Sequence, residues 1–424
     1  MLPTPRLAAA LAAALLAAPR AASADEPAPP AAPTWYRDVL PIVQERCQGC
    51  HRPGGVGPFA LRTAEDAAAH AAMIAEVVEE RRMPPWHADP AVGRFVNDRS
   101  LTAAQRATIV AWARGDQALG DPAHAPTPRT WPTGWRMGEP DAVVATPAPY
   151  RVAARGTVEY QYFNVPTDFG EDKWVSALEV QVDAPTVVHH VLVFVRYPRE
   201  RGRSPEVKDG LAGYFASLLP GDAVLAFPEG TAKWLPQGSV LVFQVHYTPD
   251  GEERRDQPKL GLKFVPRERV EREFVTTSVH TTRFKIPPGA RGHVVEASRR
   301  FDHDTVLWGL TPHMHLRGES FRYELELPDG SRRPLLTVPR YDFDWQTTYR
   351  LAEPVFLPAG SVVRGRATYD NSADNPWNPD PTREVRFGEQ THHEMMIGYL
   401  EVVTATPAER AAWERARAAG GAGK

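Results

Sequence analysis

The stretch LPQGSVLVFQVHY, residues 235–247, decides the fold class of this chain. A proline–glycine turn opens it, and a run rich in valine, phenylalanine and tyrosine follows, which is typical of a β-strand. A second stretch, LPAGSVVRGRATY, covers residues 357–369 and repeats the Leu, Pro, Gly, Ser, Val and final Tyr. So short a match could reflect shared turn chemistry alone. Together with the histidines described below, it predicts a duplicated β unit.

Similar short strand patterns surround both copies of the repeat. They run from about residue 140 to 404 and are separated by turn signals such as TPDG, IPPG and LPDG. Frequent short strands with such turns are typical of antiparallel sandwiches or barrels. An ordinary sandwich holds about 100 residues, which is less than half of this region. We therefore expect two all-β antiparallel, jelly-roll-like sandwiches, over residues 141–268 and 269–404.

Histidines occur inside these strand patterns. VVHHVLVF contains His189 and His190, QVHY contains His246, and PHMHLRG contains His313 and His315. Residues i and i+2 of a strand share a face, so the two imidazoles of an HxH pair can meet one metal ion. Two adjacent histidines can do so only at a strand end or a bulge. The simplest interpretation is one metal motif at an equivalent place in each copy of the β unit.

A further segment, THHEMMIGYL, offers donors for the second group: His392, His393, Met395 and Met396. Each pair alone has a plainer explanation, because strand histidines are often hydrogen-bonded and adjacent methionines often pack in a core. Imidazole accepts zinc, copper, iron or nickel, whereas a thioether prefers Cu(I), so the mixed set favours copper. A blue-copper site would need a cysteine thiolate, and another motif uses both cysteines.

That motif is CQGCH, with Cys47, Cys50 and His51. It matches the C-x-x-C-H signature of covalent c-type haem attachment, in which the histidine ligates the iron. A zinc site would need a second ligand pair, and a thioredoxin-like pair would need a βαβ pattern. The sequence offers neither, so we predict one covalently attached haem.

Helical patterns flank the haem motif. TWYRDVLPIVQERC predicts an amphipathic helix before it, and Thr102 with Gln105 predicts a capping box at the start of a later helix. In this arrangement residues 35–120 resemble a class I cytochrome c, a small all-α domain.

The cytochrome resemblance implies a methionine as the distal iron ligand. We expect Met83, in RRMPPWHAD, to be that ligand. His87 and His70 are competing ligands. Met73 lies in a helical pattern, where packing is the expected role.

The ends and linkers have compositions of their own. Residues 1–24 predict a secretory signal with an A-S-A cleavage site, and their apolar run is too short for a membrane anchor. An exported protein, periplasmic or extracellular and without stable membrane insertion, is therefore expected. Residues 25–34 predict a disordered linker, residues 121–140 an extended Pro-rich linker, and residues 405–424 a C-terminal tail with a short exposed helix. The net charge of −3, with no block of one sign, predicts no nucleic-acid partner.

The order of the motifs HHVLVF, QVHY, HMH and HEMM resembles that of the copper type II, ascorbate-dependent monooxygenases. This family includes peptidylglycine α-hydroxylating monooxygenase and dopamine β-monooxygenase. The resemblance covers roughly residues 140–404, and YDNSADNPWNP resembles bacterial members. It implies two copper ions, one in each sandwich, facing each other across a water-filled cleft.

The resemblance also implies a role for each group of donors. The first copper, held by His189, His190 and His246, would store and pass on an electron. The second copper would bind O2 and hydroxylate a C–H bond. The family places the thioether ligand directly after an acidic residue, so the resemblance implies Met395 rather than Met396. The implied ligands of the second copper are His313, His315 and Met395.

Three departures from the family bear on the substrate and the electron donor. Both cysteines belong to the haem motif, so no disulfide is expected. Thr311 stands where peptide-amidating members carry an arginine, so a glycine-extended peptide is not the expected substrate. Tyr399 keeps a residue that those enzymes use near the substrate, and we include it among the catalytic candidates. The fused haem suggests that a redox partner supplies electrons through it, alongside or instead of ascorbate.

The sequence thus predicts an exported multi-domain oxidoreductase: a copper-dependent monooxygenase acting on O2 and a small-molecule substrate. One alternative is a copper and haem electron-transfer or copper-binding protein without hydroxylase chemistry. A second alternative is a zinc hydrolase built on the histidines.

Overall fold

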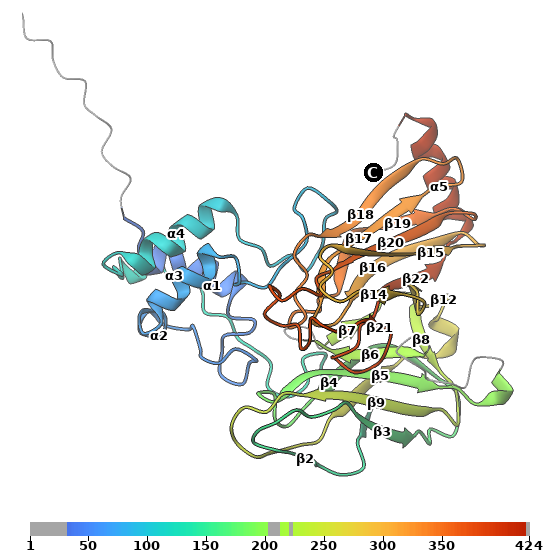
Figure 1. The fold of residues 1–424 in the computed structure, drawn as a ribbon, viewed down its shortest axis with the longest axis horizontal. Coiled ribbons are helices and arrows are strands. Elements are labelled where there is room, and N and C mark those ends of the chain that lie inside the picture. The colour runs from blue at the N-terminus through green and yellow to red at the C-terminus, as the bar shows by residue number, and fades with distance from the viewer. Residues whose placement is uncertain (1–31, 202–212, 220–223, 421–424) are drawn as a thin grey trace, which may run out of the picture.

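The computed structural model describes residues 32–201, 213–219 and 224–420, and β-sheet dominates it while helices are few (Figure 1). The predicted signal, residues 1–24, lies outside the described residues, as does most of the predicted linker 25–34. Within the described ranges, no helix is long and apolar enough to cross a membrane.

While helix α5 lies apart beside the strands, helices α1 to α4 lie together at one side of the molecule (Figure 1). Trp35 and Trp112 pack at their centre, with ring centroids 5.2 Å apart. The capping box of Thr102 and Gln105 is present, with each side chain bonded to the backbone N–H of the other residue. The main helices of this region are η1 (Trp35–Val39), α1 (Leu40–Arg46), α2 (Ala64–Ala68), α3 (Ala71–Glu79) and α4 (Ala103–Arg114). The remaining helices are η2 (Pro122–His124), η3 (Arg199–Arg201), η4 (Arg267–Arg269) and α5 (Pro407–Ala418).

The first group of strands forms two facing sheets. One sheet has the order β1-β11-β4-β8-β12, with β7 on β4, and the other has the order β3-β9-β5-β6. The strands of the first sheet are β1 (Ala142–Ala145), β4 (Lys173–Gln181), β7 (Val224–Ala226), β8 (Thr231–Leu235), β11 (Lys259–Phe264) and β12 (Arg272–Glu273). Those of the second sheet are β3 (Gln161–Pro166), β5 (Val188–Arg196), β6 (Tyr214–Leu218) and β9 (Val240–Tyr247). A separate pair joins β2 (Tyr150–Val152) and β10 (Arg254–Asp256).

The second group also forms two facing sheets. Their orders are β13-β22-β16-β19 and β15-β20-β17-β18. The strands of the first are β13 (Val275–His280), β16 (Thr305–His313), β19 (Tyr349–Leu357) and β22 (Ile397–Thr404). Those of the second are β15 (His293–Arg300), β17 (Gly318–Glu326), β18 (Arg332–Val338) and β20 (Val362–Tyr369). A separate pair joins β14 (Lys285–Ile286) and β21 (Val385–Arg386).

The two groups share one topology. Each group has eight principal strands once the short strands are left out, which are β2, β7, β10 and β12 in the first group and β14 and β21 in the second. When these eight are numbered 1 to 8 in chain order, both groups have the sheet orders 1-8-3-6 and 2-7-4-5. The repeated stretches 235–247 and 357–369 lead into β9 and β20, each the seventh strand of its group. The sequence repeat therefore marks equivalent strands.

The histidine motifs do not occupy equivalent places, and that part of the expectation is wrong. His189 and His190 lie on β5, the fourth principal strand of the first group, and His313 ends β16, the third of the second group. The reason is the way in which the groups meet. The sheet containing β5 and β6 in the first group faces the sheet containing β16 and β22 in the second, and the Tyr214 and Tyr399 rings lie 4.7 Å apart between them.

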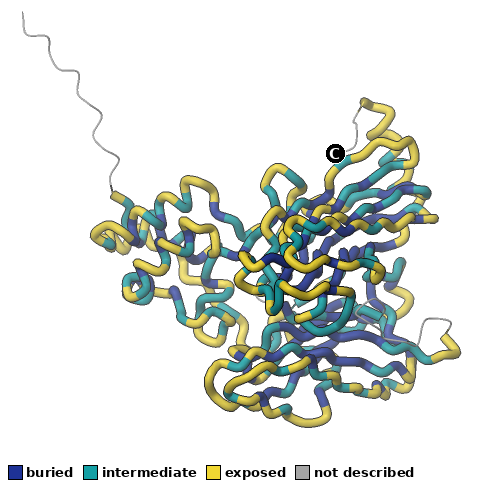
Figure 2. The backbone as a smooth tube through the Cα atoms, viewed as in Figure 1, coloured by how far each residue is buried: buried dark blue, intermediate teal, exposed yellow. Residues whose placement is uncertain are grey.

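Each pair of sheets encloses its own hydrophobic core. Strand β17 shows how the sequence achieves this, since Phe321, Tyr323 and Leu325 are fully buried while their neighbours point outward. Figure 2 shows the buried residues concentrated within the sheets. In the described residues the strand pairs are antiparallel except for β8 with β12, which is parallel and departs from the all-antiparallel expectation. Strand β12 belongs to the first group's sheet, and the second group's sheets start with β13.

The helical region packs directly on the second group of strands. Phe95 forms an antiparallel bridge with Leu351, and the Trp86 and Phe95 rings lie 4.9 and 5.4 Å from the ring of Tyr349. The amide of Asn97 donates to the carbonyl of Thr348 at 2.7 Å. These contacts hold the start of β19, and Thr348 just before it, against the helical region.

Candidate metal centre

Three histidines of the first group converge on one point. His189, His190 and His246 each offer a ring nitrogen, and these nitrogens lie within 4.8 Å of one another. The Nδ1 atoms of His190 and His246 lie 3.1 and 3.2 Å from Nδ1 of His189. Within the described residues, this is the one group of three or more His, Cys, Asp or Glu side chains that meets the geometry of a metal site.

A β-bulge makes this convergence geometrically feasible. His190 pairs with His246 across β5 and β9, and the register shifts between Val188 and His190, which leaves His189 as the extra residue. The bulge turns His189 onto the same side as its neighbour. The adjacent histidines predict a bulge or a strand end here, and the structure confirms the bulge.

The protonation states of the first set suit a metal ion. His189 donates its Nε2–H to Oδ1 of Asp344 at 3.2 Å, which leaves Nδ1 with a free lone pair. Burial lowers the pKa of His246 to about 3 and that of His190 well below its ordinary value, so both rings are neutral at pH 7. Nδ1 of His189 has one lone pair, so only one of its two contacts with the other Nδ1 atoms can be a hydrogen bond. A metal ion can instead bind the lone pairs of all three Nδ1 atoms. This donor set therefore fits a metal ion that accepts imidazole ligands, such as copper, zinc, iron or nickel.

The second set joins the end of β16 to the segment before β22. The rings of His313 and His315 lie 5.2 Å apart and almost perpendicular, at 88°. His313 donates Nδ1–H to Oε1 of Gln346 at 2.5 Å, and His315 donates Nδ1–H to the carbonyl of His393 at 3.3 Å. Both rings therefore present Nε2 as the free donor, and Nε2 of His315 is buried without a hydrogen-bond partner in the described part of the chain.

Met395 lies beside this second set. His313 pairs with Ile397 at the end of the sheet, and Oε2 of Glu394 accepts hydrogen bonds from the backbone N–H groups of both His315 and Met395, at 2.9 and 3.3 Å. Glu394 fixes this alignment, because its carboxylate accepts from the N–H of His315 at 2.9 Å and from the N–H of Arg317 at 2.7 Å. Met395 is 4% exposed and packs with Tyr399.

Met396 has a different place. It is fully buried in the core between the second group's sheets, where its methyl group lies against Gly365. Its neighbour Met395 is outside that core, in a cluster with Ile397, Tyr399 and Phe387. The donor chemistry of His313, His315 and Met395 fits a copper ion, as the first set does.

The segment 370–382, which includes most of YDNSADNPWNP, supports the second set through hydrogen bonds to Arg317. Asn371 is fully buried; its Oδ1 accepts from Nε of Arg317 at 2.8 Å, and its amide donates to the carbonyls of Pro287 and Arg383. Arg317 in turn donates to the carbonyl of His392 at 3.1 Å. His392 and His393 thus act here through their backbone carbonyls.

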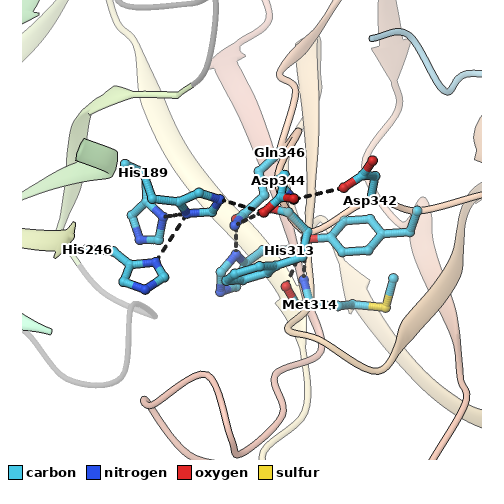
Figure 3. A network of polar contacts seen from close by, with 10 residues as sticks. His189, His246, His313, Met314, Asp342, Asp344 and Gln346 are labelled. Carbon is cyan, nitrogen blue, oxygen red and sulfur yellow. Dashed lines mark hydrogen bonds and ion pairs between the residues drawn. The ribbon is translucent and has the colours of Figure 1, made fainter. Parts of the chain in front are cut away.

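One loop contacts both sets. The Phe343 ring stacks on His189 at 5.0 Å and lies 6.0 Å from the rings of both His246 and His315. Figure 3 shows Asp344 and Gln346 of the same loop lying between His189 and His313. An aromatic side chain therefore contacts both sets where the family resemblance implied open water.

Two tyrosines border the sets. The Tyr399 ring lies 6.4 Å from His313, and the backbone of Tyr399 pairs with Thr311. Thr311 is buried and donates to the hydroxyl of Thr348 at 2.9 Å, so no positive charge stands at this position. The Tyr160 ring lies 4.8 Å from His246, and its buried hydroxyl has no hydrogen-bond partner within the described ranges.

The haem motif lines a cavity of about 390 Å³ in the helical region. Cys47, Cys50, His51 and Met83 all border it, and most of the remaining lining is apolar. His51 donates Nδ1–H to the carbonyl of Phe59 at 3.0 Å, which leaves Nε2 as its free donor. Three arginines also line the cavity and suit the carboxylates of a haem: Arg46, Arg82 and Arg99. These residues fit a covalently attached haem.

The competing haem ligands lie elsewhere. His70 stacks on Phe59 at 3.8 Å, and His87 borders a different cavity beside Arg340. Neither is among the described residues that line the cavity of Cys47 and Cys50. Met73, expected to pack within its helix, is instead 52% exposed at the cavity edge, because its face of α3 is not covered.

Sequence reasoning missed the residues that orient the ligands. Phe343, Asp344 and Gln346 come from a loop with no recognisable motif, and Arg317 looks like an ordinary strand-flanking arginine. Glu394 gave a signal through its position before Met395, but only the structure shows it bonded to the backbone at His315.

Comparisons with known proteins add little. No protein-family model matches the chain, and no curated protein matches it. Among solved structures, the VP2 subviral particle of infectious bursal disease virus is 9% identical, with 63% of this chain and 72% of that chain covered and a TM-score of 0.20. The major capsid protein P2 of bacteriophage PM2 is 7% identical, with 62% and 97% covered and a TM-score of 0.25. A Paenibacillus xanthan lyase is 11% identical, with 68% and 28% covered and a TM-score of 0.18. TM-scores this low support no inference about function.

Proposed function

We propose that this chain is a copper-dependent monooxygenase that uses O2 to hydroxylate a C–H bond of a small-molecule substrate. The proposal rests above all on the convergence of three Nδ1 atoms from His189, His190 and His246. The second set, which includes Met395, is close by, because the Phe343 ring contacts both His189 and His315. Two different donor sets so close together support a pair of copper ions with different tasks.

The fold supports the same family resemblance. In this proposal residues 35–120 form a c-type cytochrome domain, and residues 141–268 and 269–404 form two jelly-roll-like sandwiches. The sheet orders 1-8-3-6 and 2-7-4-5 in both groups favour jelly rolls. The cavity that brings Cys47, Cys50, His51 and Met83 together favours a haem. The motif order of the copper type II monooxygenases then assigns electron storage to the first set and O2 chemistry to the second.

The side chains of this chain prepare both sites. Bound copper would supply one-electron redox chemistry at both sites and O2 activation at the second. Gln346 binds Nδ1 of His313, and the carbonyl of His393 binds Nδ1 of His315, which leaves Nε2 of both rings free to bind a metal. Asp344 binds Nε2 of His189, which leaves Nδ1 of that ring free. In this proposal Tyr399, whose ring lies 6.4 Å from His313, would contact the substrate, while the neutral Thr311 offers no clamp for a carboxylate.

The source of electrons and the location belong to the proposal too. A haem in the helical region suits an external redox partner as donor, with ascorbate as a second reductant. Export to the periplasm or the exterior accords with the signal-like residues 1–24 and the C-x-x-C-H motif.

The test uses the full-length protein with haem attached and copper added. We expect two equivalents of bound copper, a copper–sulfur contribution in X-ray absorption of the reduced protein, and O2 consumption matched by hydroxylated product across a panel of small molecules. Met395→Ala should lower copper to about one equivalent, remove the copper–sulfur signal and abolish product formation. The matched control Met396→Leu keeps a core side chain of similar volume and should retain both ions.

Three outcomes would contradict the proposal. Two bound coppers without product-coupled O2 consumption would indicate an electron-transfer protein. Preferential binding of zinc, with hydrolytic activity, would indicate a hydrolase. An unchanged copper–sulfur signal in Met395→Ala would remove Met395 from the second site.

A further inference from the structure

Four consecutive residues of the loop before β19, Phe343 to Gln346, border the two histidine sets and the cavity of the haem motif. Phe343 stacks on His189, and Asp344 accepts a hydrogen bond from the same ring at 3.2 Å. Gln346 accepts from the second set at 2.5 Å. Trp345, between them, lines the cavity of the haem motif.

Trp345 has an unusual position in that cavity wall. Apart from Trp345, the described lining of the cavity of about 390 Å³ comes from the helical region. Trp345 also borders a second cavity of about 770 Å³, together with Gly49 of the haem motif, His189 and Asp344. Trp345 therefore borders both the cavity of the haem motif and the cavity that His189 lines.

The loop is held in place from both sides. The N–H of Trp345 donates to the carbonyl of Asp342 at 3.1 Å, and its own carbonyl accepts from the N–H of Thr347 at 2.9 Å. Tyr341 binds the backbone of Met314, next to the second set, through its hydroxyl. These contacts fix the backbone of the loop on both sides of Trp345.

We propose that Trp345 is the electron bridge between the haem and the copper of the first histidine set. The inference rests on the proposed function. In this step one electron leaves the haem iron, which goes from Fe(II) to Fe(III), and reduces copper from Cu(II) to Cu(I), with no proton transferred and no bond broken. Electron tunnelling decays steeply across empty space and more slowly through bonded atoms. From Trp345 the route to the first set is the peptide link to Asp344 and one hydrogen bond to His189.

The experiment follows the haem directly and needs no substrate. Full-length protein, with haem attached and Cu(II) loaded, receives a rapid pulse of a one-electron photoreductant without O2. Absorbance of the ferrous haem and the Cu(II) spin-resonance signal should then decay together. Trp345→Leu should slow this decay by an order of magnitude or more, and Trp345→Phe should slow it less because an aromatic ring remains. Trp413→Leu, at a tryptophan of the C-terminal helix α5 that packs on Phe356, is the matched control and should leave the rate unchanged.

Haem potential and copper content are measured for every variant, because a change in either would alter the rate for another reason. An unchanged rate in Trp345→Leu, with both cofactors loaded and the haem potential unaltered, would overturn the inference while leaving the proposed function standing. Failure of ferrous haem to reduce copper in the wild-type protein would overturn it as well. Failure of the wild-type protein to bind copper or haem would instead overturn the proposed function.

Discussion

At the scale of single residues, hydrogen-bond partners determine which imidazole nitrogen is free. Asp344 takes the Nε2–H of His189 and leaves Nδ1, whereas Gln346 takes the Nδ1–H of His313 and leaves Nε2. The histidines of the two sets therefore present different ring nitrogens. A metal ion at either set would meet rings already fixed in tautomer and orientation.

A second residue-scale feature is Lys233 on β8, which is 3% exposed. Its Nζ donates to the carbonyl of Phe215 at 2.8 Å and to the hydroxyl of Thr276 at 2.9 Å, so it links the two groups of strands. Burial lowers the pKa of Lys233 to about 8, although Glu401 and Glu273 oppose the shift.

The lowered pKa of Lys233 predicts a pH dependence of stability. The protonated form is disfavoured in the folded state, so the free energy of unfolding should rise as pH increases from about 8 toward the ordinary value of 10.5. The gain should be at most about 3 kcal/mol. Calorimetric melting temperatures over this range measure it, and Lys233→Met should remove the rise.

The matched control is Lys259→Met, at a surface lysine paired with Asp183. Its melting temperature should follow the wild-type pH profile, because surface ion pairs contribute little. If Lys233→Met and the wild-type protein showed parallel profiles, the buried lysine would not be the titrating group.

At the scale of elements, the segment 370–382 acts as a brace for the ligand-bearing segment after β16. Asn371 holds the Arg317 guanidinium and two carbonyls at once. Arg317 and Glu394 then fix the backbone on either side of the second set. An irregular segment can hold this geometry because its polar groups are satisfied internally.

Replacing Asn371 by alanine should therefore destabilise the fold and loosen the second site. The substitution leaves buried polar groups unpaired, at an expected cost of about 3 kcal/mol in the free energy of unfolding. Denaturant unfolding measures that cost, and copper titration should show weaker binding at the second site with the first retained. Asn164→Ala, which removes an exposed contact to Arg196, should change stability by less than about 0.5 kcal/mol. Equal loss of both coppers in Asn371→Ala would argue against a local brace.

At the scale of the whole molecule, the helical region and the β region are joined by an aromatic contact. Trp86 and Phe95 lie against Tyr349, a buried residue of the second group's core. Tyr349 opens β19, immediately after the loop that carries Phe343 to Gln346. The contact therefore couples the position of the helical region to that loop.

Trp86→Ala should weaken this coupling. The variant loses the ring contacts to Tyr349 and Phe95, and the connecting segment at residues 121–140 should be cut faster by a protease added in trace amounts. The effect should correspond to about 3 kcal/mol or less, as for removal of a partly buried aromatic side chain. Cleavage at the wild-type rate would show that the regions are held by other contacts, and Trp377→Ala is the surface control.

Much of this organisation follows from local sequence patterns. Turn signals and strand composition indicate a β-rich chain, and the repeat at residues 235–247 and 357–369 marks equivalent seventh strands. The bulge at His189 follows from the requirement that two adjacent histidines share a face. These features depend on periodicity and short-range sterics, which a sequence displays directly.

The tertiary structure alone decided how the pieces meet. It placed the histidine motifs on the fourth and third strands of their groups, because different sheets of the two groups face each other. It placed Met396 in the core of the second group and Met395 in a separate buried cluster with Tyr399. It also brought Phe343, Asp344 and Trp345 between the haem motif and His189, more than a hundred residues away in sequence. Such contacts arise from the packing of whole sheets, and no local pattern of residues encodes them.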